Sequence, residues 1–343
     1  MAPSVRLLTT GLACFLASVI GCELVRRIAI RRALLDTVNE RSLHTVPTPR
    51  LGGVAVVLVA VAGALFGWGD ASRESHVLVV LCGVIALVGL RDDLRPLSAL
   101  VRLAIQIAVS VAFLALVDTP ALLIARGAPL PLPPPVVSAL LVVWMVGVLN
   151  IYNFMDGMDG LAAFQAIAAS LAFAVMLGGV SSLSMFALVL GAASCGFLVH
   201  NVPPARIFLG DAGSTFIGMA FAGLAVLGMH HQVPITESAL PLAPFLLDGT
   251  FTLARRALRR EKVWKAHRTH LYQRAVQTGL GHREVLLVYI AWLTISTGAA
   301  AAASSSTAGL VAGWALALVG LVAIAAWVSR RETRQQHVST AIS

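Results

Sequence analysis

The chain has 343 residues, of which 58% are hydrophobic and 12% are charged, and its mean hydropathy is +0.87. Soluble globular proteins average about 45–50% apolar and about 25% charged residues, so the composition excludes a soluble enzyme, a disordered tail and a nucleic-acid-binding domain. The formal net charge of +9 is compatible with anionic substrates, with an anionic membrane surface, or with topology signals alone. The composition predicts an integral membrane protein.

Eleven apolar segments are long enough, or nearly long enough, to span a bilayer as helices. In chain order they cover residues 7–30, 51–68, 76–90, 99–117, 136–155, 160–178, 184–200, 214–228, 239–254, 285–303 and 308–328. No loop between them is long enough to hold a soluble domain. The predicted fold is therefore all-α, a polytopic integral membrane protein with about eleven transmembrane helices that form a single domain, residues 1–343.

The basic residues indicate the orientation of these helices. With the N-terminus outside, the outer side keeps only Arg6, Arg73 and Arg126 of the 25 Lys and Arg residues. Cytoplasmic loops carry an excess of Lys and Arg, so we expect an outside N-terminus and a cytoplasmic C-terminus. Orientation explains most of the net charge, and nucleic-acid binding is not needed to account for it.

Five acidic residues crowd the predicted cytoplasmic loop mouths, where orientation alone would favour basic residues. They are Asp92, Asp93, Asp156, Asp159 and Asp211. Ionisable groups at membrane depth are costly and are functional candidates by default. We therefore expect catalytic loops on the cytoplasmic side, at residues 31–50, 91–98, 150–160, 200–214 and 255–283.

Two of these loops carry paired or periodic carboxylates. Asp92 and Asp93 are adjacent, and their mutual repulsion favours a nearby cation or phosphate-linked metal, although neighbouring arginines could also neutralise them. In residues 150–160, Asn and Asp recur every three residues, which on a helix places each beside the next. Such a ladder offers oxygens to Mg²⁺ or hydrogen bonds to a nucleoside, whereas a simple capped turn would need one Asn or Asp. Its members are Asn150, Asn153, Asp156 and Asp159.

The segment 201–214 places Asp211 and two glycines before an apolar run. A helix N-terminus preceded by glycines is a ready anion site, and a carboxylate there suggests a cation that bridges protein to phosphate. The alternative is that Asp211 or Ser214 only caps the following helix.

A basic loop contains His267-Arg268-Thr269-His270, and an earlier loop runs from His44 through Arg50 to Gly52-Gly53. The histidines could bind zinc, but no third ligand accompanies them, so phosphate contact is the better interpretation. For the glycine pair, close helix packing and a substrate-facing role have equal weight. Asp248, inside the ninth segment, is expected to pair with Arg255 or Arg256, and His282 is expected on a surface loop.

Together these motifs resemble the polyprenyl-phosphate N-acetylhexosamine-1-phosphate transferases. That family includes phospho-N-acetylmuramoyl-pentapeptide transferase and the initiators of O-antigen and teichoic acid synthesis. The match runs in the family's order from His44 to Gln273, through the Asp-Asp pair, the Asn-x-x-Asn-x-x-Asp-Gly-x-Asp-Gly run and the Phe-x-Gly-Asp-x-Gly-Ser turn. The separated histidines of the last loop are similar to the O-antigen-initiating branch, since the muramoyl-pentapeptide branch has consecutive histidines there.

The resemblance implies that sugar-1-phosphate passes from a UDP-N-acetylhexosamine, or its 6-deoxy form, to undecaprenyl phosphate, with release of UMP. It implies Mg²⁺, with Mn²⁺ as an alternative, a bacterial inner membrane location, and a homodimer as one option. The implied roles are as follows: Asp92 and Asp93 act on the lipid phosphate, Asn153 and Asp211 bind metal, and Asp159 and Phe208 bind uracil. Further substrate contacts are expected from His44, Arg50, Asp156, Asn201, His267, Arg268 and His270. The alternative from another class is a secondary transporter, which could use the same polar residues in broken helices.

Overall fold

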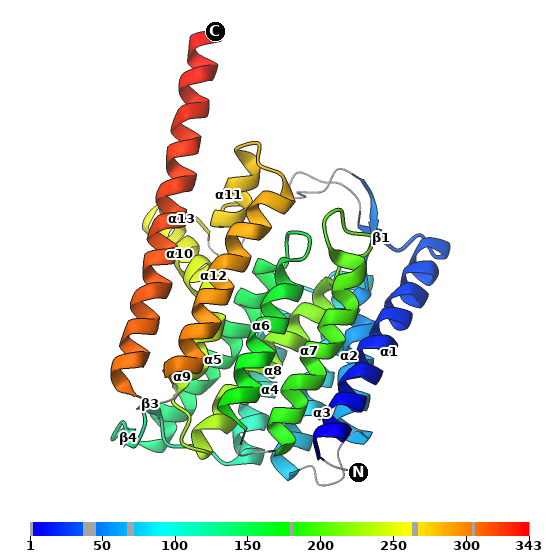
Figure 1. Cartoon of the computed structure of the whole chain (residues 1–343), viewed down its shortest axis with the longest axis vertical. Helices are drawn as coiled ribbons and strands as arrows, with labels where there is room; N and C mark the ends of the chain where they lie inside the picture. Colours follow the sequence, from blue (N-terminus) through cyan, green and yellow to red (C-terminus); the bar gives the residue numbers. More distant parts are fainter. Residues whose placement is uncertain are drawn as a thin grey trace.

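The computed structural model describes residues 3–36, 46–66, 72–178, 181–262, 267–303 and 306–342. It is a bundle of long helices that run roughly alongside one another (Figure 1). The long helices are α1 (Pro3–Arg31), α2 (Gly52–Phe66), α3 (Arg73–Leu94), α4 (Ala99–Val117), α5 (Pro134–Met155), α6 (Leu161–Met176), α7 (Ser181–Asn201), α8 (Gly210–His230), α10 (Ala243–Leu258), α12 (His282–Ala303) and α13 (Thr307–Ile342).

Short elements connect the long helices. They are α9 (Ile235–Ala239), the 3₁₀ turn η1 (Leu240–Leu242), α11 (Leu271–Gln277), and two antiparallel ladders that pair β1 (Leu35–Asp36) with β2 (Thr48–Pro49) and β3 (Leu123–Ala125) with β4 (Ala128–Pro129). Each predicted apolar segment overlaps one long helix. In the described part of the chain, seven helices are long and apolar enough to cross a membrane, namely α1, α4, α5, α7, α8, α12 and α13. A mostly helical, multi-pass protein is thus confirmed, and the number of crossings stays a prediction.

The two ends of the bundle differ in what they carry. The C-terminus, α11 and β1 lie at one end, and the N-terminus with β3 and β4 lies at the other (Figure 1). α13 continues well beyond the remaining helices at the first end. β1, from the predicted loop 31–50, and α11, from the predicted loop 255–283, therefore lie at one end of the molecule.

The helix α8 forms the centre of the bundle. Its apolar window is 100% buried, whereas the corresponding windows of α1 and α13 are 17% and 22% buried. Side chains of α8 pack against α3, α5 and α2. A helix that is apolar all round and enclosed by other helices belongs to the core, and among the seven long apolar helices α1 and α13 are the least buried.

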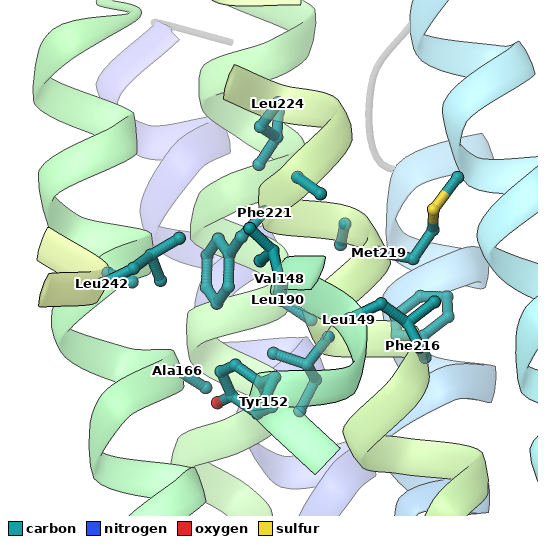
Figure 2. Packing of buried hydrophobic residues seen from close by; sticks show 14 of the residues in the cluster. Val148, Leu149, Tyr152, Ala166, Leu190, Phe216, Met219, Phe221, Leu224 and Leu242 are labelled. Carbon is teal, nitrogen blue, oxygen red and sulfur yellow. The ribbon is translucent and has the colours of Figure 1, made fainter. Parts of the chain in front are cut away.

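Aromatic packing fixes the turn between α5 and α6. The ring of Tyr152 lies 6.2 Å from that of Phe221 and 5.1 Å from that of Phe245, measured between centroids. Figure 2 shows Tyr152 beside Phe221 in this core. The buried Tyr152 hydroxyl donates a hydrogen bond to the Ala162 carbonyl at 2.6 Å. The ring is therefore packed in the core while its hydroxyl keeps a hydrogen-bond partner. It ties α5 to the start of α6 across residues 156–160.

The glycine pair at the start of α2 allows a close helix crossing. A Cβ on Gly53 would overlap the backbone of Gly213 in α8, and only glycine permits such an approach. The amides of Gly52 and Gly53 donate to the carbonyls of Phe208 and Leu209, both at 2.8 Å. The packing interpretation of this pair is therefore confirmed. The crossing holds the segment before α8 in place.

Candidate active site

A cavity of about 310 Å³ opens between α3, α4, α5, α8 and the segment that precedes α11. Its lining includes the apolar residues Ile85, Val88 and Leu103. The polar part of the lining combines amides, a carboxylate, a guanidinium and imidazoles, from Arg102, Gln106, Asn150, Asn153, Asp211, His267 and His270. We refer to it as the central cavity.

Arg102 joins two of the predicted acidic motifs. Its guanidinium contacts the Asp92 carboxylate directly and lies 3.2 Å from Oδ2 of Asp211. The Asp92 carboxylate also accepts from the Leu97 amide at 2.5 Å. Two carboxylates therefore share one guanidinium, and such a gathering of acidic groups favours a further cation.

Asp93 has a different role from that of Asp92. Its side chain is buried, and its two oxygens accept from the backbone amides of Asp211 and Ala212, each at 3.0 Å. These amides belong to the first turn of α8, where backbone donors have no partner within the helix. Gly210 adopts φ +76°, which suits glycine, and a Cβ there would crowd the Asp93 carboxylate. Asp93 thus caps α8 from another helix and does not line the central cavity.

We expect Asp93→Ala to lower the stability of the protein by about 1–2 kcal/mol, the usual cost of losing a helix cap. The measurement is the midpoint of thermal unfolding in detergent, with Asp92→Ala as the control, since Asp92 caps no helix amide of α8. An Asp93→Ala protein that unfolds like the wild type but has lost turnover would place Asp93 on the substrate instead.

The amide and carboxylate ladder divides at the end of α5. Asn150 and Asn153 lie on the helix and line the central cavity, where the Asn153 side-chain oxygen accepts from the Ser214 hydroxyl at 2.6 Å. The helix ends at Met155, so the prediction that all four members share one helix face is wrong for Asp156 and Asp159. Burial and the nearby carboxylates of Asp211 and Asp93 raise the pKa of Asp156.

A second cavity of about 430 Å³ is lined in part by residues of the segment 202–211. Asp159 and Phe208 line it together with Thr48, Pro203, His282 and Arg283. One Asp159 oxygen accepts from the Ala205 amide at 3.0 Å and lies 3.2 Å from Nδ1 of His282. The expectation that His282 lies on a surface loop is wrong, because it begins α12 and contacts Asp159.

The two loop histidines meet at the central cavity. The ring centroids of His267 and His270 are 4.9 Å apart, and His267 Nδ1 lies 3.0 Å from the Thr269 hydroxyl. Burial, followed by the charges of His270 and Arg256, lowers the pKa of His267 to about 4. At neutral pH His267 therefore offers hydrogen bonds without positive charge, and Arg102 is the permanent cation in the cavity lining.

The segment that holds these acidic motifs matches a known family model. The model of Glycosyl transferase family 4 covers residues 75–229, from α3 to the end of α8. A probable undecaprenyl-phosphate N-acetylglucosaminyl 1-phosphate transferase of Bacillus subtilis is 30% identical over 86% of this chain and 84% of its own length. The chain belongs to glycosyl transferase family 4. The family expected from the motifs is confirmed.

Other relatives of this family 4 protein have related names. A decaprenyl-phosphate N-acetylglucosaminephosphotransferase of Mycolicibacterium smegmatis is 30% identical over 85% of this chain and 81% of its own length. A phospho-N-acetylmuramoyl-pentapeptide-transferase of a Synechococcus species is 36% identical over 53% of this chain and 56% of its own length. The relatives named here share a phosphorylated sugar in their names and an extended match to this chain.

Four further predicted substrate contacts lie away from the cavity linings or outside the described residues. Asn201 is buried and its amide is used within the protein: it accepts from the Gly160 amide at 2.8 Å and donates to the Ile207 carbonyl at 2.9 Å. Arg50 is half-buried and Arg268 is exposed, and neither lines the central or the second cavity. His44 lies outside the described residues.

Three residues at the site were missed from the sequence, namely Arg102, Gln106 and His282. Arg102 stood inside the apolar segment 99–117, and an ionisable group within a membrane segment is itself a signal of function. Gln106 follows one turn later and donates to and accepts from Asn150, with the shorter contact at 2.7 Å. His282 carried no sequence signal, because its partner Asp159 lies far away along the chain.

Proposed function

We propose that this family 4 protein transfers a sugar-1-phosphate, from an N-acetylhexosamine or its 6-deoxy form, from a UDP-sugar to undecaprenyl phosphate with release of UMP. The observation that carries the proposal is that Arg102 pairs with both Asp92 and Asp211, and that Arg102 and Asp211 line one cavity together with Asn153 and the two histidines. The prenyl-phosphate acceptors in the names of the Bacillus and Mycolicibacterium relatives support it.

The donor set fits a magnesium ion that is shared with substrate phosphates. In the described residues no three His, Cys, Asp or Glu side chains cluster as a complete metal site. Mg²⁺ is commonly bound through one or two carboxylates together with substrate phosphates and water, and Asp211 and Asn153 offer such oxygens to the central cavity. Mn²⁺ accepts the same ligands. When bound, the ion would neutralise charge on the diphosphate of the donor.

The proposed reaction needs neutralisation of charge more than it needs a strong base. An oxygen of the lipid phosphate attacks the phosphorus that carries the sugar, the bond from that phosphorus to the UMP oxygen breaks, and UMP leaves with the electron pair. A phosphate monoester has a second pKa near 6, so the attacking group is mostly dianionic at neutral pH. Arg102 would hold this dianion, while Asp92 would position it or accept a residual proton.

The second cavity is the proposed place for the uracil. Phe208 offers an aromatic face, and stacking of a base on an aromatic side chain is worth about 1–3 kcal/mol. Asp159 lies in the same lining and would accept from the uracil N–H. Phe208 and Asp211 are neighbours on one short segment, so a nucleotide across this segment would place its base and its diphosphate in the two cavities.

His267 and His270 line the central cavity and come directly before α11 in the chain, and α11 lies at the end of the bundle that carries the C-terminus (Figure 1). We propose that this end is cytoplasmic, in the inner membrane of a bacterium, where the UDP-sugar is available. The apolar lining of Ile85, Val88 and Leu103 suits the first isoprene units of the acceptor. The product, a lipid-linked diphosphosugar, would begin the synthesis of a cell-surface polysaccharide such as O-antigen.

The direct test is release of UMP by the purified protein in detergent, with undecaprenyl phosphate and a panel of radiolabelled UDP-sugars. We expect UMP only when donor and acceptor are both present, label in the lipid fraction, and loss of both signals with EDTA. Label that enters proteoliposomes without release of UMP would reject the proposal in favour of the secondary transporter.

A further inference from the structure

A carboxylate that the proposed reaction does not use lies deep in the bundle. Asp248, on α10, is 0% exposed. It accepts from the amides of Leu271 and Tyr272 at 2.9 and 3.4 Å, from the Thr252 hydroxyl at 3.1 Å, and from the Tyr289 hydroxyl at 2.6 Å. Burial of a charged group is costly without such hydrogen bonds, and hydrogen bonds to a charged acceptor are the stronger kind.

The sequence-based pairing of Asp248 with an arginine is wrong. Arg255 donates to the Thr269 carbonyl at 3.0 Å, and Arg256 forms its ion pair with Glu261 at 2.8 Å. The basic side chain that faces Asp248 is instead His270, whose Nδ1 lies 3.6 Å from Oδ1. The carboxylate thus faces a histidine of the central cavity.

The two oxygens of Asp248 serve different neighbours. Oδ1 faces the His270 ring and accepts from Leu271, the residue that follows His270 in the chain. Oδ2 accepts from Tyr289 on α12 and from Tyr272. One oxygen therefore addresses the histidine, and the other attaches α10 to α12 and α11.

The His270 ring is held on several sides. It stacks on Tyr272 with 5.9 Å between centroids, it lies 4.9 Å from His267 and 6.4 Å from Phe154, and Asp248 faces its Nδ1 edge. The nitrogens of an imidazole lie on different edges of the ring, and the hydrogen-bond partner of one decides which carries the proton. Nδ1 is buried, has no hydrogen-bond partner at normal distance and lies 3.6 Å from the Asp248 carboxylate, so Nε2 is the nitrogen left for the cavity.

We propose that Asp248 is a positioning residue: it fixes the orientation of His270 and keeps a proton on Nδ1, so that Nε2 is presented to a phosphate oxygen of the substrates. The proposal rests on the proposed function, because it assumes phosphate in the central cavity. Asp248 itself does not line that cavity and acts only through the ring.

The test is a double-mutant cycle with Asp248→Asn and His270→Ala, read as kcat and KM from UMP release with UDP-N-acetylglucosamine. Loss of a partner that orients an active-site histidine typically costs about 10–100-fold, so we expect a kcat loss of that size for Asp248→Asn. Residues that act as one unit are not additive. In the His270→Ala background, Asp248→Asn should therefore change kcat by less than about twofold.

The control is Tyr289→Phe, which removes a donor from Oδ2 and leaves Oδ1 and His270 in place. We expect a lower midpoint of thermal unfolding for Tyr289→Phe, with kcat within about twofold of the wild type. An equal kcat loss in Tyr289→Phe, or an undiminished effect of Asp248→Asn in the His270→Ala background, would assign Asp248 to scaffolding alone and overturn the proposal.

A measurement on the wild-type protein covers the case in which Asp248→Asn does not fold. Nitrogen NMR of ¹⁵N-histidine-labelled protein, with His270 assigned by its absence from the His270→Ala spectrum, distinguishes the two ring nitrogens. We expect a protonated Nδ1 on His270, and a bare Nδ1 would overturn the proposal. Failure of the wild type to release UMP would instead reject the proposed function, so the two failures are distinguishable.

Discussion

Asp211→Asn is expected to reduce UMP release by about 1000-fold, the largest loss that we predict for a single substitution. Stabilisation of charge by a bound metal is worth several kcal/mol in the transition state, and each 1.4 kcal/mol corresponds to about a tenfold change in rate. The substitution keeps the size of the side chain but removes one negative charge from the central cavity. The remaining activity should need a much higher concentration of Mg²⁺. The measurement is a Mg²⁺ titration of purified protein.

The matched control for Asp211→Asn is Glu261→Gln. This glutamate belongs to the same predicted cytoplasmic side and pairs with Arg256 at 2.8 Å, but it does not line the central cavity. Its neutralisation should leave both the rate and the Mg²⁺ dependence unchanged. If Asp211→Asn kept the wild-type Mg²⁺ dependence and Asp92→Asn shifted it, the metal would belong to the Asp92 side.

Arg102→Met should lower turnover by about 100-fold or more, the range seen when a preorganised donor is removed from the site of developing negative charge. Arg102 contacts both Asp92 and Asp211, so its loss leaves two carboxylates without their shared cation. The apparent affinity for Mg²⁺ should then stay the same or rise, in contrast to Asp211→Asn. Turnover and Mg²⁺ dependence, measured in one set of titrations, separate the two substitutions.

Arg91→Met is the control for Arg102→Met. Arg91 is exposed, lies next to Asp92 in the chain and donates to the Arg95 carbonyl at 2.5 Å. Arg91→Met removes one positive charge from the same region, as Arg102→Met does, but Arg91 does not line the central cavity. Equal losses for the two variants would mean that general surface charge, and not the bridge from Asp92 to Asp211, supports turnover.

The helices could be predicted from the sequence because the bilayer sets the length of an apolar run. The segment 99–117 coincides with α4, and 136–155 differs from α5 by two residues at its start. The segment 239–254 was placed less well, since η1 and the short α9 occupy its first part and α10 continues to Leu258. Pro241 lies in η1 and Pro244 in the first turn of α10, and proline is tolerated at the start of a helix but not in its interior.

The residue types of the site could be predicted from the sequence, but the separate role of each carboxylate could not. Asp92 and Asp93 are adjacent residues of the same type, but the side chains of successive residues on a helix point about 100° apart. One therefore reaches Arg102 and the other caps α8. Asp248 was assigned to arginines one or two turns away, whereas its partners come from α11 and α12 after a break in the helix. Such contacts depend on tertiary structure, which local spacing does not report.

The crossing of Gly53 and Gly213 has a consequence for mutational scans of this protein. Neither glycine lines the central or the second cavity, yet any larger side chain at either position would push α2 away from α8. The displaced α8 would carry Asp211 with it. A mutant library scored only for growth would thus find Gly53 and Gly213 as intolerant of substitution as the carboxylates of the site. A map of intolerant positions will therefore outline the helix crossings together with the chemistry, and only assays on purified variants will separate the two.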